Sequence, residues 1–393
     1  MSARTRTVSL VAALAVVAGF VLLPSIPGTQ VRLGQPSRVF VAGPSVETTP
    51  STDTTPSTDT TLSVDETAAP SVDATVTLLA VGDLMCHSQQ FNAARYGSGY
   101  DFYPAFKPVA ALISKADIAS GNLETTLRAV PAYSGYPCFR TPRSYADALK
   151  KAGFDVLTTA NNHALDGGAS GVRNTAAYLD KLKLAHTGTD NDGPAIVEHD
   201  GVKIAYLAYT YATNGIHSPF AGAVNRIDLA RMKKAIASAR KKADLVIVCP
   251  HWGVEYTSAP RAATVTLAKA LIDAGADLIL GSHPHVVQPV RTYKGRYIVY
   301  SMGNFVSGMS VTYTDLGIMV KATVVRRASG TRVASLRVVP VYKDHTSGAG
   351  RSAYRVVDIA HTLAAPDSRT SAYDKSRMRA YLRYCRTMFG KLL

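Results

Sequence analysis

The chain has 393 residues, of which 47% are hydrophobic and 18% are charged, a balance typical of a globular protein and unlike that of a wholly disordered one. Lys and Arg outnumber Asp and Glu by 43 to 28, and the resulting net charge of +15 favours polyanionic partners, although a generally basic proteome would explain it equally well. The four cysteines have no Cys-x-x-Cys spacing, which excludes a zinc ribbon.

The N-terminal segment, residues 1–42, has the order of charges and apolar residues expected of an export signal. Arg4 and Arg6 precede an uncharged apolar stretch from Val8 to Leu23, which Pro24 closes. Because no clear small-x-small cleavage site follows, we favour an uncleaved signal-anchor over a cleaved signal. We therefore expect the protein at the extracellular face of the cell membrane, or secreted if the signal is cleaved. Nucleic acid is not an expected partner there.

Residues 43–74 are expected to form an extended linker. This segment is rich in Ser, Thr, Pro and acidic residues, contains no Lys or Arg, and has too few apolar residues to build a core. Its six acidic residues leave the remainder of the chain more basic than the total charge suggests.

Strands and helices are predicted to alternate after the linker. Apolar runs rich in Val, Ile, Leu and Tyr predict strands at 75–82, 155–159, 203–211, 244–249, 277–280, 297–301, 317–325 and 332–341. Helical spacing is found at 104–116, 143–152, 169–183, 227–242 and 261–274. This order predicts an α/β fold with a largely parallel, helix-covered sheet. The last two runs lack an intervening helix and predict an antiparallel hairpin, which would fit a second sheet.

We expect one domain over residues 75–345 and a basic C-terminal extension over residues 346–393. The extension contains an amphipathic helix candidate from Ala372 to Leu393. Packing of this helix on the domain is the expected arrangement, with membrane contact as the alternative.

Polar residues with metal-binding chemistry follow several predicted strands. Asp83 leaves the first strand after a glycine, and would either ligate a cation or cap a turn. His87 lies four residues further on, as a nearby ligand or an ordinary loop histidine. Asn122 and Glu124 share one side of an extended segment as candidate ligands, with Glu124 also a candidate base, and the alternative is a simple turn. At the edge of an open α/β sheet, such residues line a common crevice.

Histidines follow three further strands. Asn162 offers an amide oxygen to a hard cation, and the adjacent His163 is placed to protonate a leaving oxygen. His251 ends a buried strand, ahead of Trp252 and Tyr256, which would form either a substrate wall or a buried aromatic cluster.

The segment from Gly281 to His285 is the most specific of these motifs, because His283 and His285 flank one proline at a strand end and can point at one metal. Imidazole and carboxylate donors suit one or two divalent ions, Mn, Zn or Fe, better than a thiolate-bound metal.

Six segments in the same order resemble the signatures of the bacterial capsule synthesis family typified by CapA, the poly-γ-glutamate capsule proteins. They are GDLMCHS, GNLETTL, ANNHALDGG, HWGVEY, GSHPHVVQPV and YSMGNFV, within roughly residues 76 to 310. The resemblance implies a fold similar to calcineurin-type metallophosphoesterases, a double-sheet α/β sandwich covered by helices, with two metals at one edge. It implies ligand roles for Asp83, Asn162, His251, His283 and His285, and a leaving-group acid role for His163.

Two positions depart from the pattern of those phosphoesterases. Met85 stands where the first motif has a histidine, and Asn122 stands where a bridging aspartate is expected. A two-metal centre would therefore be incomplete unless His87 and Glu124 substitute, and a single metal or a degenerate binding site are the alternatives.

We expect a protein for the synthesis, assembly or processing of an anionic surface polymer such as poly-γ-glutamate, working with membrane synthase subunits. As an enzyme, it would use a metal to activate water against a phosphoester or amide, while His163 protonates the leaving group. As a binding protein, it would hold the polyanion in the same crevice without cleaving it.

Overall fold

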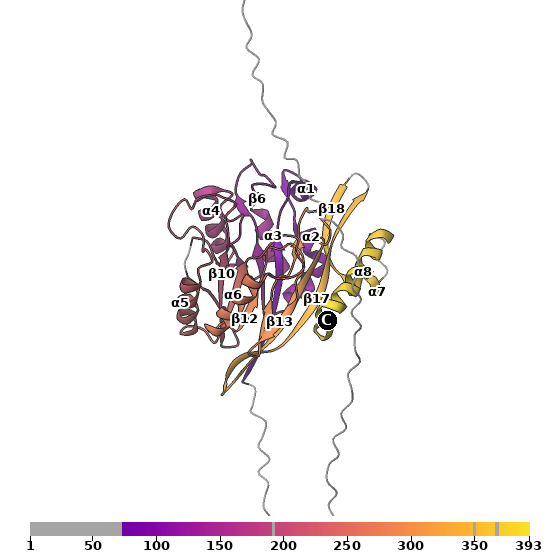
Figure 1. Ribbon diagram of the computed structural model, residues 1–393. Helices are drawn as coiled ribbons and strands as arrows, with labels where there is room; N and C mark the ends of the chain where they lie inside the picture. The colour runs from indigo at the N-terminus through magenta and orange to yellow at the C-terminus, as the bar shows by residue number, and fades with distance from the viewer. Residues whose placement is uncertain (1–72, 191–192, 349–350, 366–368) are drawn as a thin grey trace, which may run out of the picture. The chain divides into compact units, whose positions relative to one another are not determined.

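Two β-sheets stacked face to face organise the part of the chain that the computed structural model describes, namely residues 73–190, 193–348, 351–365 and 369–393. The apolar stretch Val8 to Leu23 and almost all of the expected linker lie outside these residues. Figure 1 shows the strands running together through the centre, with helices on the outside.

The first sheet has the strand order β18-β17-β16-β1-β4-β7-β8, and β15 pairs with the end of β1. Strands β1, β4, β7, β8 and β15 are parallel to their neighbours in this group, whereas β16, β17 and β18 are antiparallel. The strands are β1 (Ala74–Leu84), β4 (Ile118–Leu123), β7 (Val156–Thr158), β8 (Ala185–Thr187), β15 (Asn304–Val306), β16 (Leu316–Arg327), β17 (Gly330–Gly348) and β18 (Arg351–Asp358).

The second sheet has the order β13-β14-β12-β11-β10-β9, with four parallel strands between two antiparallel edge strands. Its strands are β9 (Ala195–His199), β10 (Val202–Thr210), β11 (Leu245–His251), β12 (Leu278–Leu280), β13 (Val290–Tyr293) and β14 (Arg296–Val299). Two small ribbons, β2 (Arg95–Tyr96) with β3 (Gly99–Tyr100) and β5 (Thr126–Arg128) with β6 (Arg140–Pro142), lie outside both sheets.

Helices cover the sheets. The longer ones are α2 (Tyr103–Ser114), α3 (Ser144–Ala152), α4 (Gly168–Lys181), α5 (Leu229–Arg240), α6 (Ala262–Asp273) and α8 (Ala372–Phe389). Short helices are α1 (Ser88–Ala93), α7 (Ile359–Ala364) and the 3₁₀ turn Gly390–Leu392. Among these described residues, no helix is both long and apolar enough to cross a membrane.

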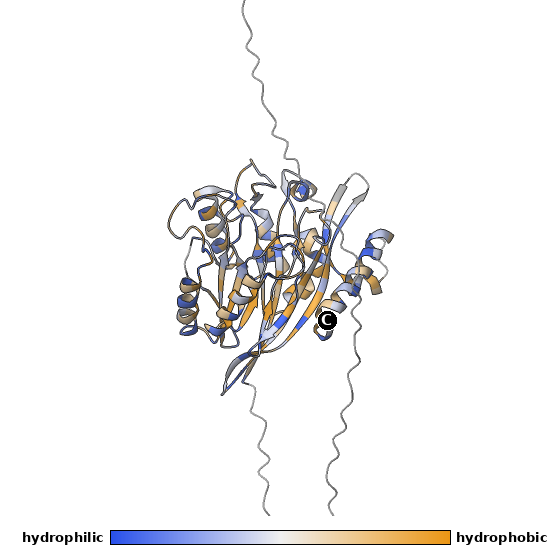
Figure 2. Cartoon of the chain, in the orientation of Figure 1, coloured by the Kyte–Doolittle hydropathy of each residue, from blue (hydrophilic) through white to orange (hydrophobic). Residues whose placement is uncertain are grey.

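Alternation along the central strands explains this layering. In β1, Leu78 and Ala80 belong to the core between the sheets, whereas Leu79 and Val81 belong to a second core beneath α2 and α3. A third core packs α5 and α6 on the outer face of the second sheet. Strands buried on both faces have nearly continuous apolar sequences, and Figure 2 shows them as the most hydrophobic elements. The predicted double-sheet α/β sandwich covered by helices is thus confirmed.

The C-terminal segment belongs to the same fold. The predicted hairpin is confirmed as β16 and β17, which extend the sheet of β1. Strand β17 crosses the boundary expected after residue 345 and pairs with β18, so that boundary falls inside a strand. Helix α8 places Met378 and Cys385 in the core between the sheets, because its apolar face finds a partner there. The predicted packing of this helix on the domain is confirmed.

Candidate metal centre

The carboxyl ends of parallel strands from both sheets meet at one edge of the sandwich. Asp83 lies near the end of β1, His251 is the last residue of β11, and His283 follows β12. An isolated bridge joins His251 to Ser282, which holds the ends of β11 and β12 together. Residues separated by up to 200 positions in sequence are therefore brought into one cluster, as expected at the carboxyl edge of such sheets.

Two buried carboxylates stand close together in this cluster. Asn122 Nδ2 donates to Asp83 Oδ1 at 2.8 Å and lies 3.4 Å from Glu124 Oε2. Glu124 has no exposed surface, and burial, followed by the charge of Asp83, raises the pKa of its carboxyl group well above the usual value. A cation between the two carboxylates would stabilise the charged form of Glu124 against both burial and the repulsion from Asp83.

The paired histidines occupy a strained loop. His283 has φ 101° and His285 has φ 58°, both in the left-handed region that non-glycine residues seldom adopt. His285 Nδ1 lies 3.2 Å from Asp83 Oδ2 and 3.0 Å from Asn304 Oδ1. Burial lowers the pKa of His285, but its hydrogen bond to Asp83 and the charge of Asp83 leave the pKa raised overall.

The other two histidines of the cluster are held neutral. Burial, and then the neighbouring His285, lower the pKa of His283 to about 3. Burial also lowers the pKa of His251 well below its usual value. Neutral imidazole is the form that binds metals, so both side chains are already in the ligating state at neutral pH.

His251 links the two sheets across the site. Its Nε2 lies 2.7 Å from Asn162 Oδ1 and 3.7 Å from Glu124 Oε1, while its Nδ1 lies 3.0 Å from Ser282 Oγ. Asn162, in the turn after β7, is thereby placed beside the carboxylates. These contacts assemble amide, imidazole and carboxylate donors within one buried region.

Two groups of side chains have ligand atoms close enough to share an ion. Asp83, Glu124 and His285 form one group and Glu255, His283 and His285 form the other, with all ligand atoms of each group within 4.8 Å of one another. Glu124 Oε1 and His283 Nδ1 are buried without a hydrogen-bond partner among the described residues. Buried polar atoms normally have partners, so these free positions fit a divalent cation. Their donor types suit Zn, Mn or Fe.

His163 forms a pair with a carboxylate beside the metal ligands. Its Nδ1 lies 2.7 Å from Asp166 Oδ2, and that oxygen also accepts the N–H of Phe139 at 2.6 Å. Because Asp166 can hold a proton on Nδ1, proton exchange with a bound molecule would take place at Nε2. His163 is 4% exposed and lines the cavity over the cluster, where Nε2 can exchange a proton with a bound molecule.

Three predicted positions have other surroundings. His87 is buried, accepts the N–H of Gly308 on Nδ1 and belongs to neither ligand group. Asn122 lies among the ligands, but its NH₂ group faces Asp83 while its carbonyl oxygen is 3.3 Å from Asn161 Nδ2. The side chain of Met85 is buried, so no ligand atom stands at that position.

A cavity of about 440 Å³ opens over the cluster. Tyr136, Cys138 and Tyr256 contribute to its wall, and no Lys or Arg is among the lining residues. Tyr256 is 44% exposed, as expected for a substrate wall. Trp252, by contrast, is buried and donates to Tyr300 O at 2.9 Å, so it belongs to the aromatic cluster that was the alternative.

Sequence reasoning missed the residues that orient the histidines. Asp166 belongs to no recognised motif, although its spacing of three from His163 in a turn is a usable signal. Asn304 follows a glycine, a combination that is common in turns. The role of Glu255 depends on its position relative to the loop that contains His283 and His285, which its own sequence does not fix.

Comparison with known proteins gives one family. Residues 77–309 match the family described as "Bacterial capsule synthesis protein PGA_cap". The chain is 34% identical over 284 residues to "Capsule biosynthesis protein CapA" of Bacillus anthracis, covering 68% of this chain and 67% of that one. It is 30% identical over 288 residues to "PGA biosynthesis protein CapA" of Bacillus subtilis (strain 168), covering 70% of each.

Solved structures of more distant sequence also align. A putative 5'-nucleotidase from Staphylococcus aureus in complex with alpha-ketoglutarate matches with TM-score 0.45 and 12% identity, covering 79% of this chain and 58% of that one. The calcineurin-like phosphoesterase YfkN from Bacillus subtilis matches with TM-score 0.43 and 14% identity, covering 79% of this chain and 99% of that one.

Proposed function

Because this chain belongs to the bacterial capsule synthesis protein family PGA_cap, we propose that it acts in the synthesis, assembly or processing of an anionic capsule polymer such as poly-γ-glutamate, through a metal-dependent, hydrolase-like site. One observation carries the second half of this proposal: two ligand groups share His285, and Glu124 and His283 each have a buried atom without a hydrogen-bond partner in the part of the chain that the structure describes.

The metal ligands and the His163–Asp166 pair would have different chemical roles. A divalent ion held by Asp83, Glu124 and His285, with or without a second ion at Glu255 and His283, would activate water and stabilise negative charge. His163, oriented by Asp166, would give its Nε2 proton to the departing oxygen or nitrogen. Tyr256 and the other wall residues would hold the substrate against the site.

Placement at the membrane is part of the same proposal. The N-terminal apolar stretch would anchor the chain, and the linker would hold the domain at the extracellular face near membrane synthase subunits. If the signal is cleaved, the domain would be secreted.

A non-catalytic role in holding the polyanion is the second candidate. Asn122 stands where the phosphoesterases that the sequence resembles have a bridging aspartate, and no Lys or Arg among the described residues lines the cavity over the cluster. In this reading the ion itself would hold an anionic group of the polymer, and no bond would be cleaved.

The proton donor separates the two candidates. His163→Ala should lower turnover of a phosphodiester or of poly-γ-glutamate by about 10²–10⁴-fold while leaving the metal content unchanged, because the imidazole lies outside both ligand groups. His361→Ala, at an exposed histidine of α7, is the matched control and should change neither quantity. A metal-loaded protein that turns over neither substrate would eliminate the hydrolase proposal in favour of binding.

A further inference from the structure

A second cavity lies at the opposite edge of the sandwich from the metal ligands. It has a volume of about 480 Å³ and is bounded by the end of α5, the starts of β11, β12 and β14, and the β16–β17 turn. Strand β11 spans seven residues between this edge and His251, so the two cavities are about 20 Å apart. The volume falls within the range of roughly 300–1,000 Å³ found for ligand sites.

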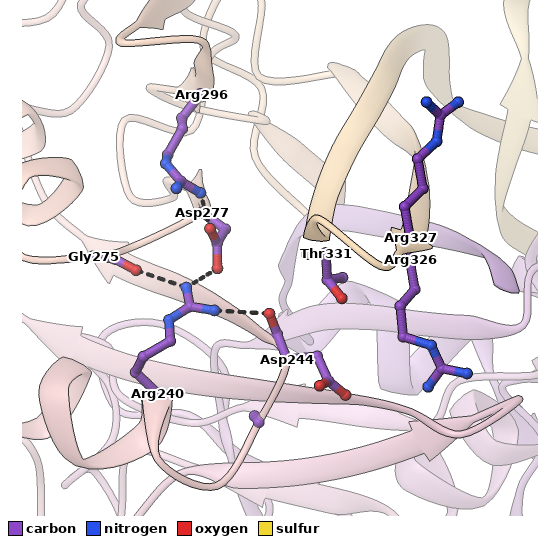
Figure 3. A pocket seen from close by; sticks show the side chains of 10 residues that line it. Arg240, Asp244, Gly275, Asp277, Arg296, Arg326, Arg327 and Thr331 are labelled. Atoms are coloured by element: carbon purple, nitrogen blue, oxygen red, sulfur yellow. Dashed lines mark hydrogen bonds and ion pairs between the residues drawn. The ribbon is translucent and has the colours of Figure 1, made fainter. Parts of the chain in front are cut away.

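Asp277 is the buried anchor of this second cavity. It is 2% exposed, accepts the N–H of Val246 at 2.8 Å and forms ion pairs with both Arg240 and Arg296. Figure 3 shows the two guanidinium groups approaching this one carboxylate from different sides. Asp244, which lines the same cavity, also acts on Arg240 through its charge, so these two arginines together face two carboxylates.

Arg240 is fixed by neutral acceptors as well. It donates to Asp244 O at 2.7 Å and to Gly275 O at 2.9 Å, which orients its guanidinium without neutralising it. Burial lowers the pKa of Arg240, and burial together with the charge of Arg240 lowers that of Arg296. The two side chains are therefore held together against their mutual repulsion.

The β16–β17 turn supplies further positive charge. Arg326 donates to Gly201 O at 2.7 Å, again a neutral acceptor, and Arg327 has a buried Nε without a partner among the described residues. Figure 3 shows these two side chains leaving the end of β16 in opposite directions. The cavity thus contains four arginines against two aspartates. An adjoining hollow of about 200 Å³ shares Asp277 and Arg296 and adds Arg332 and Lys294, the last of which is paired with Asp273.

We propose that this arginine cavity binds carboxylate groups of the anionic polymer, as a docking site separate from the metal centre. This inference rests on the proposed function for the identity of the polymer. Guanidinium groups pair with carboxylates in bidentate geometry, and several of them around one cavity suit a chain with repeated carboxylates. No Lys or Arg lines the cavity over the metal cluster among the described residues. The polymer would therefore bind through its carboxylates at the arginine cavity, while the metal centre at the other edge of the sandwich cleaves or holds it.

Binding of poly-L-glutamate to the full-length protein in a non-ionic detergent tests this site. The double variant Arg326→Gln with Arg327→Gln should lose about tenfold or more in affinity, because it removes two charges and leaves the Asp277 pairs intact. Thr331→Glu, which keeps every arginine and adds a repelling charge to the wall, should weaken binding in the same direction. Arg379→Gln with Arg383→Gln, at exposed positions of α8, is the charge-matched control and should bind like the unmodified protein.

Metal content, measured on the same samples, should be unchanged in all these variants, which separates this test from that of the metal centre. Equal losses in the α8 control would show that binding depends on overall charge, and no loss in the cavity variants would show that the polymer binds elsewhere. Either result would overturn the proposal. Polyphosphate and phosphatidylglycerol vesicles serve as the other anion sources. If either depends on Arg326 and Arg327 while poly-L-glutamate does not, the cavity serves phosphate groups and the assignment to carboxylates is wrong.

Discussion

Burial and neighbouring charges set the protonation states of His283 and His285 at the carboxyl edge of the sandwich. His283 is kept neutral by burial, whereas His285 is charged more easily because Asp83 contacts it. The sequence identifies these residues because each follows an apolar strand. Their partners Asp166 and Asn304 could not be assigned in the same way, because hydrogen bonds across loops leave no periodic signal. The amide orientation of Asn122 likewise depends on Asn161, a neighbour that its own motif does not contain.

Asp166 is expected to affect turnover through His163. Asp166→Asn should lower turnover by about 10–100-fold, because the carboxylate no longer fixes the proton on Nδ1, while metal content stays unchanged. Asp180→Asn is the control, since Asp180 forms a comparable pair with His186 but its side chain is 74% exposed. A loss of metal in Asp166→Asn would show instead that Asp166 supports the ligands.

Thiol reactivity provides a test of the cavity wall. Burial raises the pKa of Cys86, Cys249 and Cys385 to about 12, whereas Cys138 is only partly buried and lines the cavity over the metal cluster. One thiol should therefore react quickly with a chromogenic disulfide at pH 8, and the other three only after denaturation. Cys138→Ser should abolish the fast phase. A fast phase that survives this substitution would place the accessible thiol elsewhere.

At the scale of elements, the alternation of strand and helix predicted an α/β fold with a helix-covered sheet, whereas the two-sheet sandwich was expected only from the resemblance to a known family. The apolar runs marked β1, β10, β11, β16 and the first part of β17, because buried strands favour apolar residues. The short strand β15 was not predicted, since it is held by pairing with the end of β1 rather than by its own pattern. Strand β18 and the continuation of β17 were missed for a related reason: this hairpin is less apolar and its pairing is decided by the sheet.

Gly82 lies where β1 approaches the segment leading into β15, directly before the candidate ligand Asp83. A Cβ on Gly82 would lie 1.8 Å from Gly303 O, a backbone atom of the segment leading into β15. Gly82→Ala should therefore destabilise the fold by about 3 kcal/mol or more and displace Asp83, so that metal is lost as well. Urea denaturation and elemental analysis measure the two effects. Gly99→Ala, which meets only one atom at 4.0 Å, is the control, and equal stability of the two variants would refute the close approach.

At the scale of the whole molecule, the two cavities lie at opposite ends of the strands that carry them. The metal ligands collect where parallel strands end, and the arginines collect where β11 and β12 begin. The basic charge of the chain was visible in its composition, but its concentration around Asp277 was not, because the cavity combines residues from α5, β14 and the β16–β17 turn.

Export is tested on whole cells. If the N-terminal segment anchors the chain and residues 43–74 form an extended linker outside the cytoplasm, protease added to intact, wall-stripped cells should release the folded domain into the medium. A cytoplasmic protein assayed in parallel serves as the control for cell integrity. Complete protection of the domain would contradict export.

The most direct test of the account is the metal content of the purified full-length protein and of His283→Ala combined with His285→Ala. We predict one or two divalent transition ions per chain in the unmodified protein. The double variant should lose them, because His285 belongs to both ligand groups, while His361→Ala keeps them. An unmodified protein that contains no metal, even after reconstitution with Mn, Zn or Fe, would contradict the assignment of a metal centre.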